Sequence, residues 1–255
     1  MFHNVQPIGP SEGSSALREV RFAGFQGTTL IDFPRRIASI FFVSGCDLRC
    51  PYCHNGALFS VPEADRMPPD TVWAELDKRR GFIDGIVLTG GEPSLHPGLV
   101  AFARIVKERY PFEVKLDTNG LNGDFLRDML PFLDHVAIDL KTTPDRYALL
   151  GSSLSPEEVN GRLVRTRELL TAFPGEVEYR TTMYPPVVGD IETLRAMMVF
   201  VPPNADLYLQ RFMPDHAWSE EARAVTSFEP THIEALAMEL RRETGRDRIF
   251  VRTYA

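Results

Sequence analysis

Short runs rich in β-branched and aromatic residues alternate with helical patterns along most of this chain, and this alternation limits the possible folds most strongly. The chain has 255 residues, which fits one large α/β domain. Strand and helix patterns in repeated succession predict a parallel sheet. The predicted strands are residues 38–44, 85–90, 112–118, 135–141, 176–182 and 206–212, with a weaker run at 248–252.

Six strand–helix units are fewer than the eight of a closed barrel. We therefore expect an open, partial (β/α)6 TIM-like barrel with residues 248–252 as an edge, and a doubly wound open sheet is the alternative. Residues 1–20 are rich in Gly, Ser and Pro without periodicity, which predicts a loosely held polar tail. Residues 21–255 are then expected to form a single domain.

Two of the predicted helices carry clear end signals. Ser155 followed by Glu158 predicts a capping box at a helix start. In the last helix the apolar residues recur at helical spacing from Ile233 to Leu240, and Gly245 predicts the C-terminal end. One face of that helix is expected to be buried.

Charge and cysteine content exclude several classes of function. The chain has 28 Lys and Arg against 35 Asp and Glu, a net charge of -7, and no long basic run, which argues against sequence-independent nucleic-acid binding. No segment approaches the ~18 continuous apolar residues of a membrane span, and the N-terminus lacks the pattern of a signal peptide. With three cysteines the chain cannot form a disulfide framework. We expect a cytoplasmic protein with reduced thiols.

Polar residues follow the predicted strands at their carboxyl ends, where α/β proteins bind ligands. Each has a structural alternative: a helix cap for Glu92, a left-handed turn for Asn119, and an ion pair for Asp139 with Lys141 or for Arg180 with a neighbour. The histidines His54, His96, His135 and His216 are interpreted as structural. The predicted rim consists of Gly90, Gly91, Glu92, Asp117, Asn119, Asp139, Lys141, Arg180 and Gln210.

All three cysteines, Cys46, Cys50 and Cys53, lie within eight positions. A structural zinc site would need a fourth ligand, and His54 is poorly placed to provide it. Three buried thiols without a metal are disfavoured because the surrounding loop is polar. A 4Fe–4S cluster would use one thiolate per iron and leave one iron open for an exogenous ligand. The sequence therefore favours an iron–sulfur cluster.

Cys46-x3-Cys50-x-Tyr52-Cys53 followed by "GGEP" resembles the signature of the radical S-adenosylmethionine (SAM) enzymes. From about residue 24 the segments "GFQGTTLIDFP", "CPYCHN", "GIVLTGGEPSL", "KLDTNG", "AIDLK", "YRTTMYP" and "LQRFMP" are similar to the activating proteins of anaerobic ribonucleoside-triphosphate reductase, and more broadly to activases of glycyl-radical enzymes. Inside the cysteine motif, Asp47-Leu48 replaces the Asn-Phe common in that family.

This resemblance implies a radical SAM core that binds a 4Fe–4S cluster and SAM. It implies that Tyr52 and Asn55 lie near the adenosine, and that Asp117 and Asn119 lie near the ribose. Gly90, Gly91 and Glu92 would receive the methionine amino group, Asp139 and Lys141 would reach the methionine and ribose, and Arg180 and Gln210 would complete the site.

The function implied is formation of a 5'-deoxyadenosyl radical that abstracts a glycine Cα hydrogen from a partner glycyl-radical enzyme under anaerobic conditions. A flavodoxin- or ferredoxin-like protein would supply the electron. The alternatives are a radical SAM enzyme that acts on a small molecule or peptide, and a non-catalytic iron–sulfur electron carrier.

Overall fold

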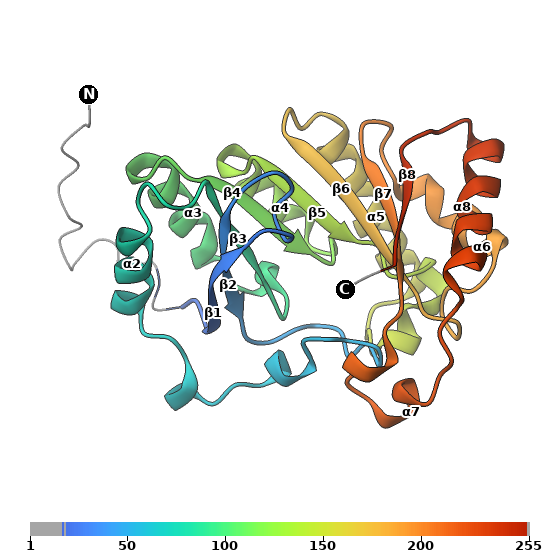
Figure 1. Cartoon of the computed structure of the whole chain (residues 1–255), viewed down its shortest axis with the longest axis horizontal. Coiled ribbons are helices and arrows are strands. Elements are labelled where there is room, and N and C mark those ends of the chain that lie inside the picture. The colour runs from blue at the N-terminus through green and yellow to red at the C-terminus, as the bar shows by residue number, and fades with distance from the viewer. Residues whose placement is uncertain (1–16, 18, 254–255) are drawn as a thin grey trace. The chain divides into compact units, whose positions relative to one another are not determined.

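The computed structural model describes residue 17 and residues 19–253. Most of the predicted tail, residues 1–16 and 18, lies outside the described residues. Eight strands follow one another in the sheet in chain order (Figure 1): β1 (Phe22–Thr29), β2 (Ala38–Val43), β3 (Gly85–Gly90), β4 (Glu113–Thr118), β5 (His135–Asp139), β6 (Glu176–Met183), β7 (Asp206–Arg211) and β8 (Ile249–Arg252).

All seven strands predicted from the sequence are present, and β8 ends the strand order as expected for an edge. Strands β2, β3 and β4 pair in parallel, and so do β6, β7 and β8. The sheet is not closed in the described part of the chain, which confirms the prediction of an open α/β fold. Strand β1 was not predicted, and it pairs antiparallel with β2.

Helices connect most of the parallel strands. The α-helices are α2 (Pro69–Lys78), α3 (Gly98–Arg109), α4 (Gly123–Met129), α5 (Pro156–Thr171), α6 (Ile191–Met197), α7 (Glu220–Arg223) and α8 (Pro230–Thr244). Short 3-10 helices are η1 (Gly56–Phe59), η2 (Glu63–Asp65), η3 (Pro93–Leu95), η4 (Leu130–Phe132), η5 (Pro144–Leu150), η6 (Met198–Phe200) and η7 (Pro214–His216). None of the described helices is long and apolar enough to cross a bilayer.

The predicted helix ends are confirmed. At the start of α5, the Ser155 hydroxyl accepts a hydrogen bond from the Glu158 backbone N–H, and the Glu158 carboxylate accepts one from the Ser155 N–H at 2.8 Å. This capping box satisfies two N–H groups that the helix cannot. Helix α8 buries Ile233 and Leu240, packs on β7 and β8, and ends at Gly245 with φ 66°.

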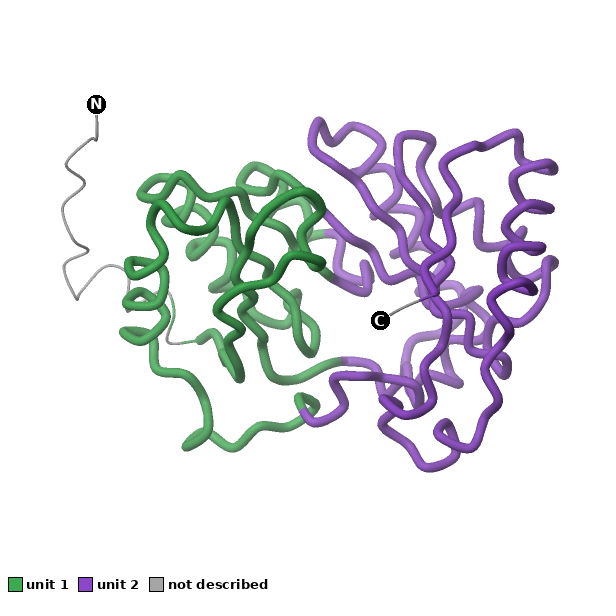
Figure 2. Tube along the Cα trace, in the orientation of Figure 1, with its two compact units in different colours: residues 1–46, 58–117, 124–135 green, residues 47–57, 118–123, 136–255 purple. Residues whose placement is uncertain are grey.

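The chain divides into two compact units (Figure 2). Unit 1 comprises the chain up to residue 46, residues 58–117 and residues 124–135, and it contains β1 to β4 with α2 and α3. Its core includes three aromatic rings in edge-to-face contact, Phe22, Phe41 and Phe102, with centroids 5.5–6.0 Å apart.

Unit 2 comprises residues 47–57, 118–123 and 136–255. It contains β6, β7 and β8, with α8 packed on β7 and β8 and α6 packed on α8. The three paired strands begin at the same end, so their carboxyl ends place polar side chains at one edge of the unit.

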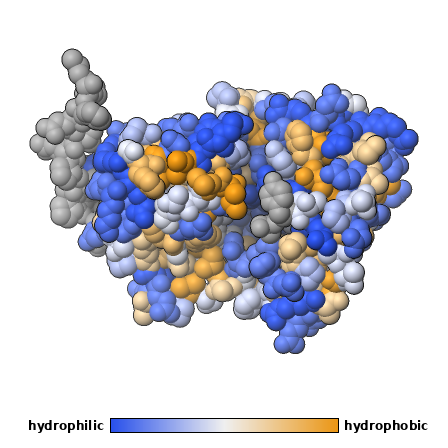
Figure 3. All heavy atoms as spheres, viewed as in Figure 1, coloured by the Kyte–Doolittle hydropathy of each residue, from blue (hydrophilic) through white to orange (hydrophobic). Residues whose placement is uncertain are grey.

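Several large hydrophobic side chains remain exposed. Leu30 and Ile31, between β1 and β2, are 70% and 73% exposed, and Trp218, after η7, is 51% exposed. Figure 3 shows hydrophobic residues interspersed with hydrophilic ones on the face in view.

Candidate active site

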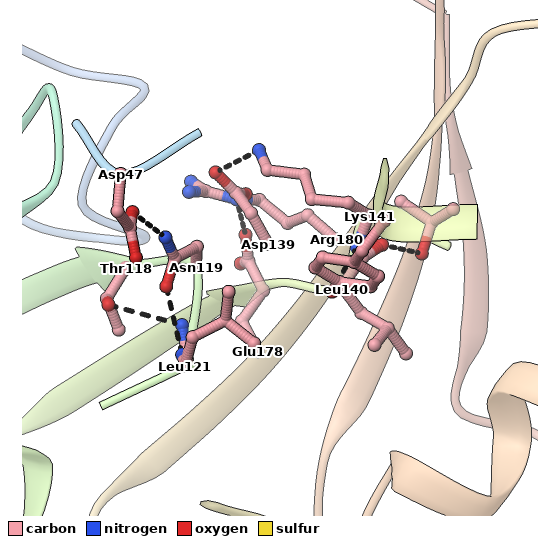
Figure 4. A network of polar contacts seen from close by, with 12 residues as sticks. Asp47, Thr118, Asn119, Leu121, Asp139, Leu140, Lys141, Glu178 and Arg180 are labelled. Atoms are coloured by element: carbon pink, nitrogen blue, oxygen red, sulfur yellow. Dashed lines mark hydrogen bonds and ion pairs between the residues drawn. The ribbon is translucent and has the colours of Figure 1, made fainter. Parts of the chain in front are cut away.

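A charged network lies where β5 and β6 bring three predicted residues together in unit 2 (Figure 4). The Asp139 carboxylate accepts a hydrogen bond from Arg180 Nε at 2.7 Å and another from Lys141 Nζ at 3.1 Å. Asp139 is the last residue of β5, and Lys141 follows two positions later. The side chains are 30%, 15% and 19% exposed for Asp139, Arg180 and Lys141, so the network is largely shielded from water.

The network fixes the charge state of its members. Burial disfavours the Asp139 carboxylate, but Arg180 and Lys141 outweigh this effect and hold the pKa of Asp139 well below its usual range. Burial also disfavours the Lys141 ammonium, and Asp139 outweighs it, so that the pKa of Lys141 is raised well above its usual value. Both shifts favour the charged forms, so the site holds a carboxylate between two cations.

A further carboxylate in this network was not predicted. Glu178, 4% exposed in β6, lies 3.9 Å from Arg180 Nε and 3.6 Å from an Arg252 guanidinium nitrogen. Glu178 and Arg180 share a face of β6 because alternate residues of a strand point the same way. That period-two spacing was the sequence signal that could have identified Glu178.

Cys50 and Cys53 lie in the same unit, in a segment that we name the cysteine loop (residues 47–57). The Cys53 backbone N–H donates to the Cys50 carbonyl at 3.1 Å, which closes a tight turn between the two cysteines. Burial raises the pKa of the Cys50 thiol to about 11 and also raises that of Cys53, while the nearby Lys141 charge opposes both shifts. The Asn55 backbone N–H likewise opposes the shift at Cys53.

Tyr52, between the two cysteines of the loop in sequence, is buried in unit 2. Its ring lies 5.0 Å from that of Tyr184, and the residue is 4% exposed. Burial raises the pKa of Tyr52 well above its usual value, and Cys50 adds to the shift. The buried Tyr52 hydroxyl has no hydrogen-bond partner among the described residues.

The segment after β7 covers part of the cysteine loop. The Ser219 N–H donates to the Pro51 carbonyl at 3.0 Å, and the rings of His54 and His216 lie 5.4 Å apart. A Cβ added at Gly56 would lie 2.4 Å from the Trp218 indole, so the loop backbone is in close contact with that ring. Burial and the neighbouring His216 lower the pKa of His54.

Asn119 joins this side of the site through a residue of the cysteine loop. Its side-chain Nδ2 donates to Asp47 Oδ1 at 2.7 Å (Figure 4), and its side-chain Oδ1 accepts from the Leu121 N–H at 2.9 Å. Asn119 is therefore in a turn, as one interpretation of the sequence had it, and also in contact with the cysteine loop. Asp47 had been identified only as a departure from the family pattern.

Unit 1 contains five further predicted residues, namely Gly90, Gly91, Glu92, Asp117 and Cys46. The Gly91 N–H donates to the Val43 carbonyl at 2.8 Å, and the Glu92 N–H donates to the Gly45 carbonyl at 2.7 Å. A Cβ at Gly91 would lie 2.0 Å from the Gly45 oxygen, and Gly90 has φ 116°. The glycine pair is needed because this turn is pressed against the backbone that leads into Cys46.

Glu92 acts as a cap, the structural alternative considered for it. The residue is 1% exposed, and its carboxylate accepts from the Ser94 N–H at 2.9 Å at the start of η3. Nearby, buried His96 is positioned by the backbone: its Nδ1 accepts from the Arg21 N–H at 3.4 Å, and its Nε2 is 2.9 Å from the Ser44 carbonyl. The structural interpretation of His96 thus holds.

Three predicted residues remain. Asp117, in unit 1, accepts a hydrogen bond at 2.5 Å from Lys115, whose side chain is 2% exposed. Cys46 is half-buried in unit 1, and Gln210 is half-buried on β7, where it is in register with Thr182 and Arg252.

The donor set of unit 2 fits the expected cofactors. Cys50 and Cys53 are free thiols that would hold iron as thiolates, and the Lys141 ammonium, whose charge acts on both, would complement an anionic cluster. The same ammonium, together with the buried Tyr52 hydroxyl, can bind the polar groups of a zwitterionic ligand. Within the described residues no three His, Cys, Asp or Glu side chains surround one metal-ion position. A 4Fe–4S cluster does not need three side chains around one metal position, because each cysteine binds a different iron.

Residues 40–171 match the sequence model of the family described as the Radical SAM superfamily. This span is more than half of the chain. The chain belongs to the radical SAM superfamily. Enzymes of this superfamily use a 4Fe–4S cluster and SAM, so the match supports the cofactors expected from the cysteine motif.

Curated relatives of this radical SAM enzyme are activating enzymes. A protein of Methanocaldococcus jannaschii, provisionally named a glycyl-radical enzyme activating enzyme, is 32% identical over 78% of this chain and 82% of its own length. A pyruvate formate-lyase-activating enzyme of Clostridium pasteurianum is 27% identical over 49% of this chain, which spans about half (54%) of that relative. The family that was expected from the sequence is thereby confirmed at the level of glycyl-radical enzyme activation.

Solved structures confirm the fold. Streptococcus suis SuiB in complex with S-adenosylmethionine aligns with a TM-score of 0.60 at 13% identity, over 83% of this chain and 48% of SuiB. QueE from Escherichia coli aligns with a TM-score of 0.55 at 14% identity, over 92% of this chain and 94% of QueE. Both alignments place the radical SAM enzyme in the same open α/β architecture.

Proposed function

We propose that this radical SAM enzyme activates a glycyl-radical enzyme, and that its partner is anaerobic ribonucleotide reductase. The observation that carries the proposal is the 32% identity to a relative named as an activating enzyme, over 82% of that relative. The choice of reductase rests on the resemblance of seven sequence segments to the reductase activases. A cytoplasmic location and a flavodoxin- or ferredoxin-like electron donor belong to the same proposal.

The proposed cofactor ligands are the three cysteines, Cys46, Cys50 and Cys53, one for each of three irons. When bound, the cluster supplies the electron that splits SAM into methionine and a 5'-deoxyadenosyl radical, which takes a hydrogen atom from a partner glycine Cα and becomes 5'-deoxyadenosine. The polypeptide's part is to bind and orient these groups and to exclude water.

The network in unit 2 gives the chain a way to bind SAM by charge. Lys141 is proposed to bind the methionine carboxylate, because its ammonium is held permanently charged beside Cys50 and Cys53. Asp139 and Arg180 keep Lys141 in place through the shared carboxylate. Each charge-assisted hydrogen bond contributes about 1.5–3 kcal/mol.

The remaining contacts are proposed from the family pattern. Glu92, with Gly90 and Gly91, is assigned to the methionine amino group, and the buried Glu92 carboxylate is a suitable acceptor. Tyr52 and Asn55 are assigned to the adenosine.

Asp117 and Asn119 are assigned to the ribose side. Arg180 and Gln210 would complete the site from β6 and β7.

Metal analysis tests the cluster directly. After anaerobic reconstitution we expect about four irons per chain, and Cys46→Ala, Cys50→Ala or Cys53→Ala should each abolish cluster assembly. His54→Ala is the matched control in the same loop and should retain the iron. If the protein instead contains one zinc per chain, and His54→Ala loses it, the site is a structural zinc module.

Electron paramagnetic resonance tests the activase reaction. With reductant and SAM, the enzyme should form 5'-deoxyadenosine and generate a glycyl-radical doublet on the reductase, and no doublet on a reductase whose radical glycine is replaced by alanine. If the doublet forms on pyruvate formate-lyase and not on the reductase, pyruvate formate-lyase replaces the reductase as the proposed partner. If 5'-deoxyadenosine forms but neither partner acquires a radical, the activase proposal is abandoned in favour of a small-molecule or peptide substrate.

A further inference from the structure

Asp47 follows the first cysteine of the motif and makes a side-chain contact with a residue distant in sequence. Its Oδ1 accepts a hydrogen bond of 2.7 Å from the Asn119 amide, across 72 positions of the chain (Figure 4). Because the acceptor is a carboxylate, this bond belongs to the stronger, charge-assisted class. Both residues lie in unit 2, and Asn119 is 4% exposed.

The turn that carries Asn119 is a rigid anchor. The Asn119 side-chain oxygen Oδ1 accepts from the Leu121 N–H at 2.9 Å, which fixes the orientation of the side-chain amide. The next residue, Gly120, has φ 74°, and its carbonyl accepts from the Thr166 hydroxyl at 2.7 Å. A Cβ at Gly120 would lie 3.1 Å from Ile138, so the turn is closely packed on its neighbours. The Asn119 donor therefore has a fixed position.

The cysteine loop is held to the rest of unit 2 at several points of its backbone. The Arg49 N–H donates to the Leu150 carbonyl at 2.7 Å, and the Pro51 carbonyl accepts from Ser219 at 3.0 Å. At Asp47 the contact is made by the side chain. This contact is made one residue after Cys46, where the chain enters the loop, so it is placed to fix the direction of that entry.

From these contacts we propose that the Asp47–Asn119 hydrogen bond couples the cysteine loop to the turn at the end of β4, so that Asp47 is a positioning residue for SAM. Asp47 aligns the cysteine loop with the turn that would meet the ribose, without itself touching the cofactor. This inference rests on the proposed function, since it requires the enzyme to bind SAM at a cluster. Loss of the bond would leave both elements folded but free to shift relative to each other, which weakens SAM binding.

Four variants separate the hydrogen bond from the charge. Asp47→Ala removes the acceptor, and Asn119→Asp replaces the donor by a second carboxylate, so each should weaken SAM binding about tenfold, equivalent to about 1.4 kcal/mol. Asp47→Asn keeps an acceptor oxygen and should bind SAM within about twofold of wild type. The exchange Asp47→Asn with Asn119→Asp restores one donor and one acceptor and should recover most of the affinity lost in Asn119→Asp.

The measurement is the dissociation constant of SAM for the reconstituted enzyme, read from the change that SAM causes in the cluster's electron paramagnetic resonance spectrum, with iron content measured alongside. Asp190→Ala is the stability control: the exposed Asp190 caps α6 in the same unit by accepting from the Thr193 N–H at 2.7 Å. Its loss should lower the stability but leave the SAM affinity unchanged.

The coupling is refuted if Asp47→Ala binds SAM as tightly as wild type, or if the exchange binds no better than Asn119→Asp alone. If Asp47→Ala fails to assemble the cluster, recovery of iron and of affinity in the exchange supports the coupling, and no recovery refutes it. Failure of the wild-type enzyme to bind or cleave SAM would instead refute the proposed function, so the two outcomes are distinguishable.

Discussion

The replacement Asp139→Asn tests the charged network most sharply, because it removes the carboxylate that accepts from both cations. Asp139 accepts from Arg180 at 2.7 Å and from Lys141 at 3.1 Å, so the neutral variant takes the shared negative charge from two shielded cations, and Arg180 keeps the more distant Glu178 at 3.9 Å. Removing one partner of a fully buried pair costs about 3–5 kcal/mol. Since the Asp139 side chain is 30% exposed, we expect a smaller loss, about 2 kcal/mol of unfolding free energy.

Urea unfolding of the cluster-free protein measures this loss. With a denaturant dependence of about 3 kcal/mol/M, the midpoint should fall by about 0.7 M. Lys141→Met is the matched comparison, because Asp139 stays paired with Arg180, and it should cost less than half as much. For SAM binding we expect a different result. Lys141→Met should weaken the affinity for SAM, although it costs less unfolding free energy than Asp139→Asn.

The pH dependence provides a second test. Because the pKa of Asp139 is lowered on folding, its contribution is fully present above the unfolded value of about 3.9 and is lost as the pH falls below it. The difference between wild type and Asp139→Asn should therefore be constant from about pH 5 to 8 and should shrink below about pH 4. Equal midpoints at pH 7, or a difference that does not shrink in acid, would refute the assigned network.

Two further predictions concern unit 1. Gly91→Ala places a Cβ 2.0 Å from the Gly45 oxygen, so it should cost about 2 kcal/mol of unfolding free energy and lower the iron content. The control Gly161→Ala, which has open space in α5, should raise the stability by up to about 1 kcal/mol. A Gly91→Ala protein of wild-type stability would contradict the close contact. Burial lowers the pKa of His96, so the unfolded chain takes up a proton first and the stability should fall as the pH drops below about 6.5. The variant His96→Gln should show a flatter profile of urea midpoints between pH 5 and 8, and an unchanged slope would contradict the assignment.

Most of the fold could be predicted from the sequence because each parallel strand is a compact apolar run between helical patterns. Strand β1 could not, since its sequence, FAGFQGTT, contains two glycines and lacks a regular alternation. It is stabilised by its antiparallel pairing with β2 and by the contact of the Arg79 guanidinium with the Phe25 ring, 4.6 Å from its centroid. Such support comes from tertiary structure and leaves no local pattern.

The candidate site was predicted in its residue types more fully than in its contacts. The sequence placed Asp139 and Lys141 together, and it offered either a ligand or an ion pair as their partner. The structure adds that they pair with each other and with Arg180. The contact between Asp47 and Asn119 joins positions 72 residues apart, so no spacing rule could reveal it. The assignment of Asp139, Lys141, Arg180 and Asn119 as cofactor ligands stays a prediction.

The close contact between Trp218 and the loop backbone at Gly56 gives the protein an intrinsic fluorescent reporter. The chain has two tryptophans, and the other, Trp73, is 6% exposed in the core of unit 1 against Phe102. Emission from the half-exposed indole is therefore separable by its longer wavelength and by its access to aqueous quenchers. Assembly of the metal centre can thus be followed optically, in real time and without any added dye.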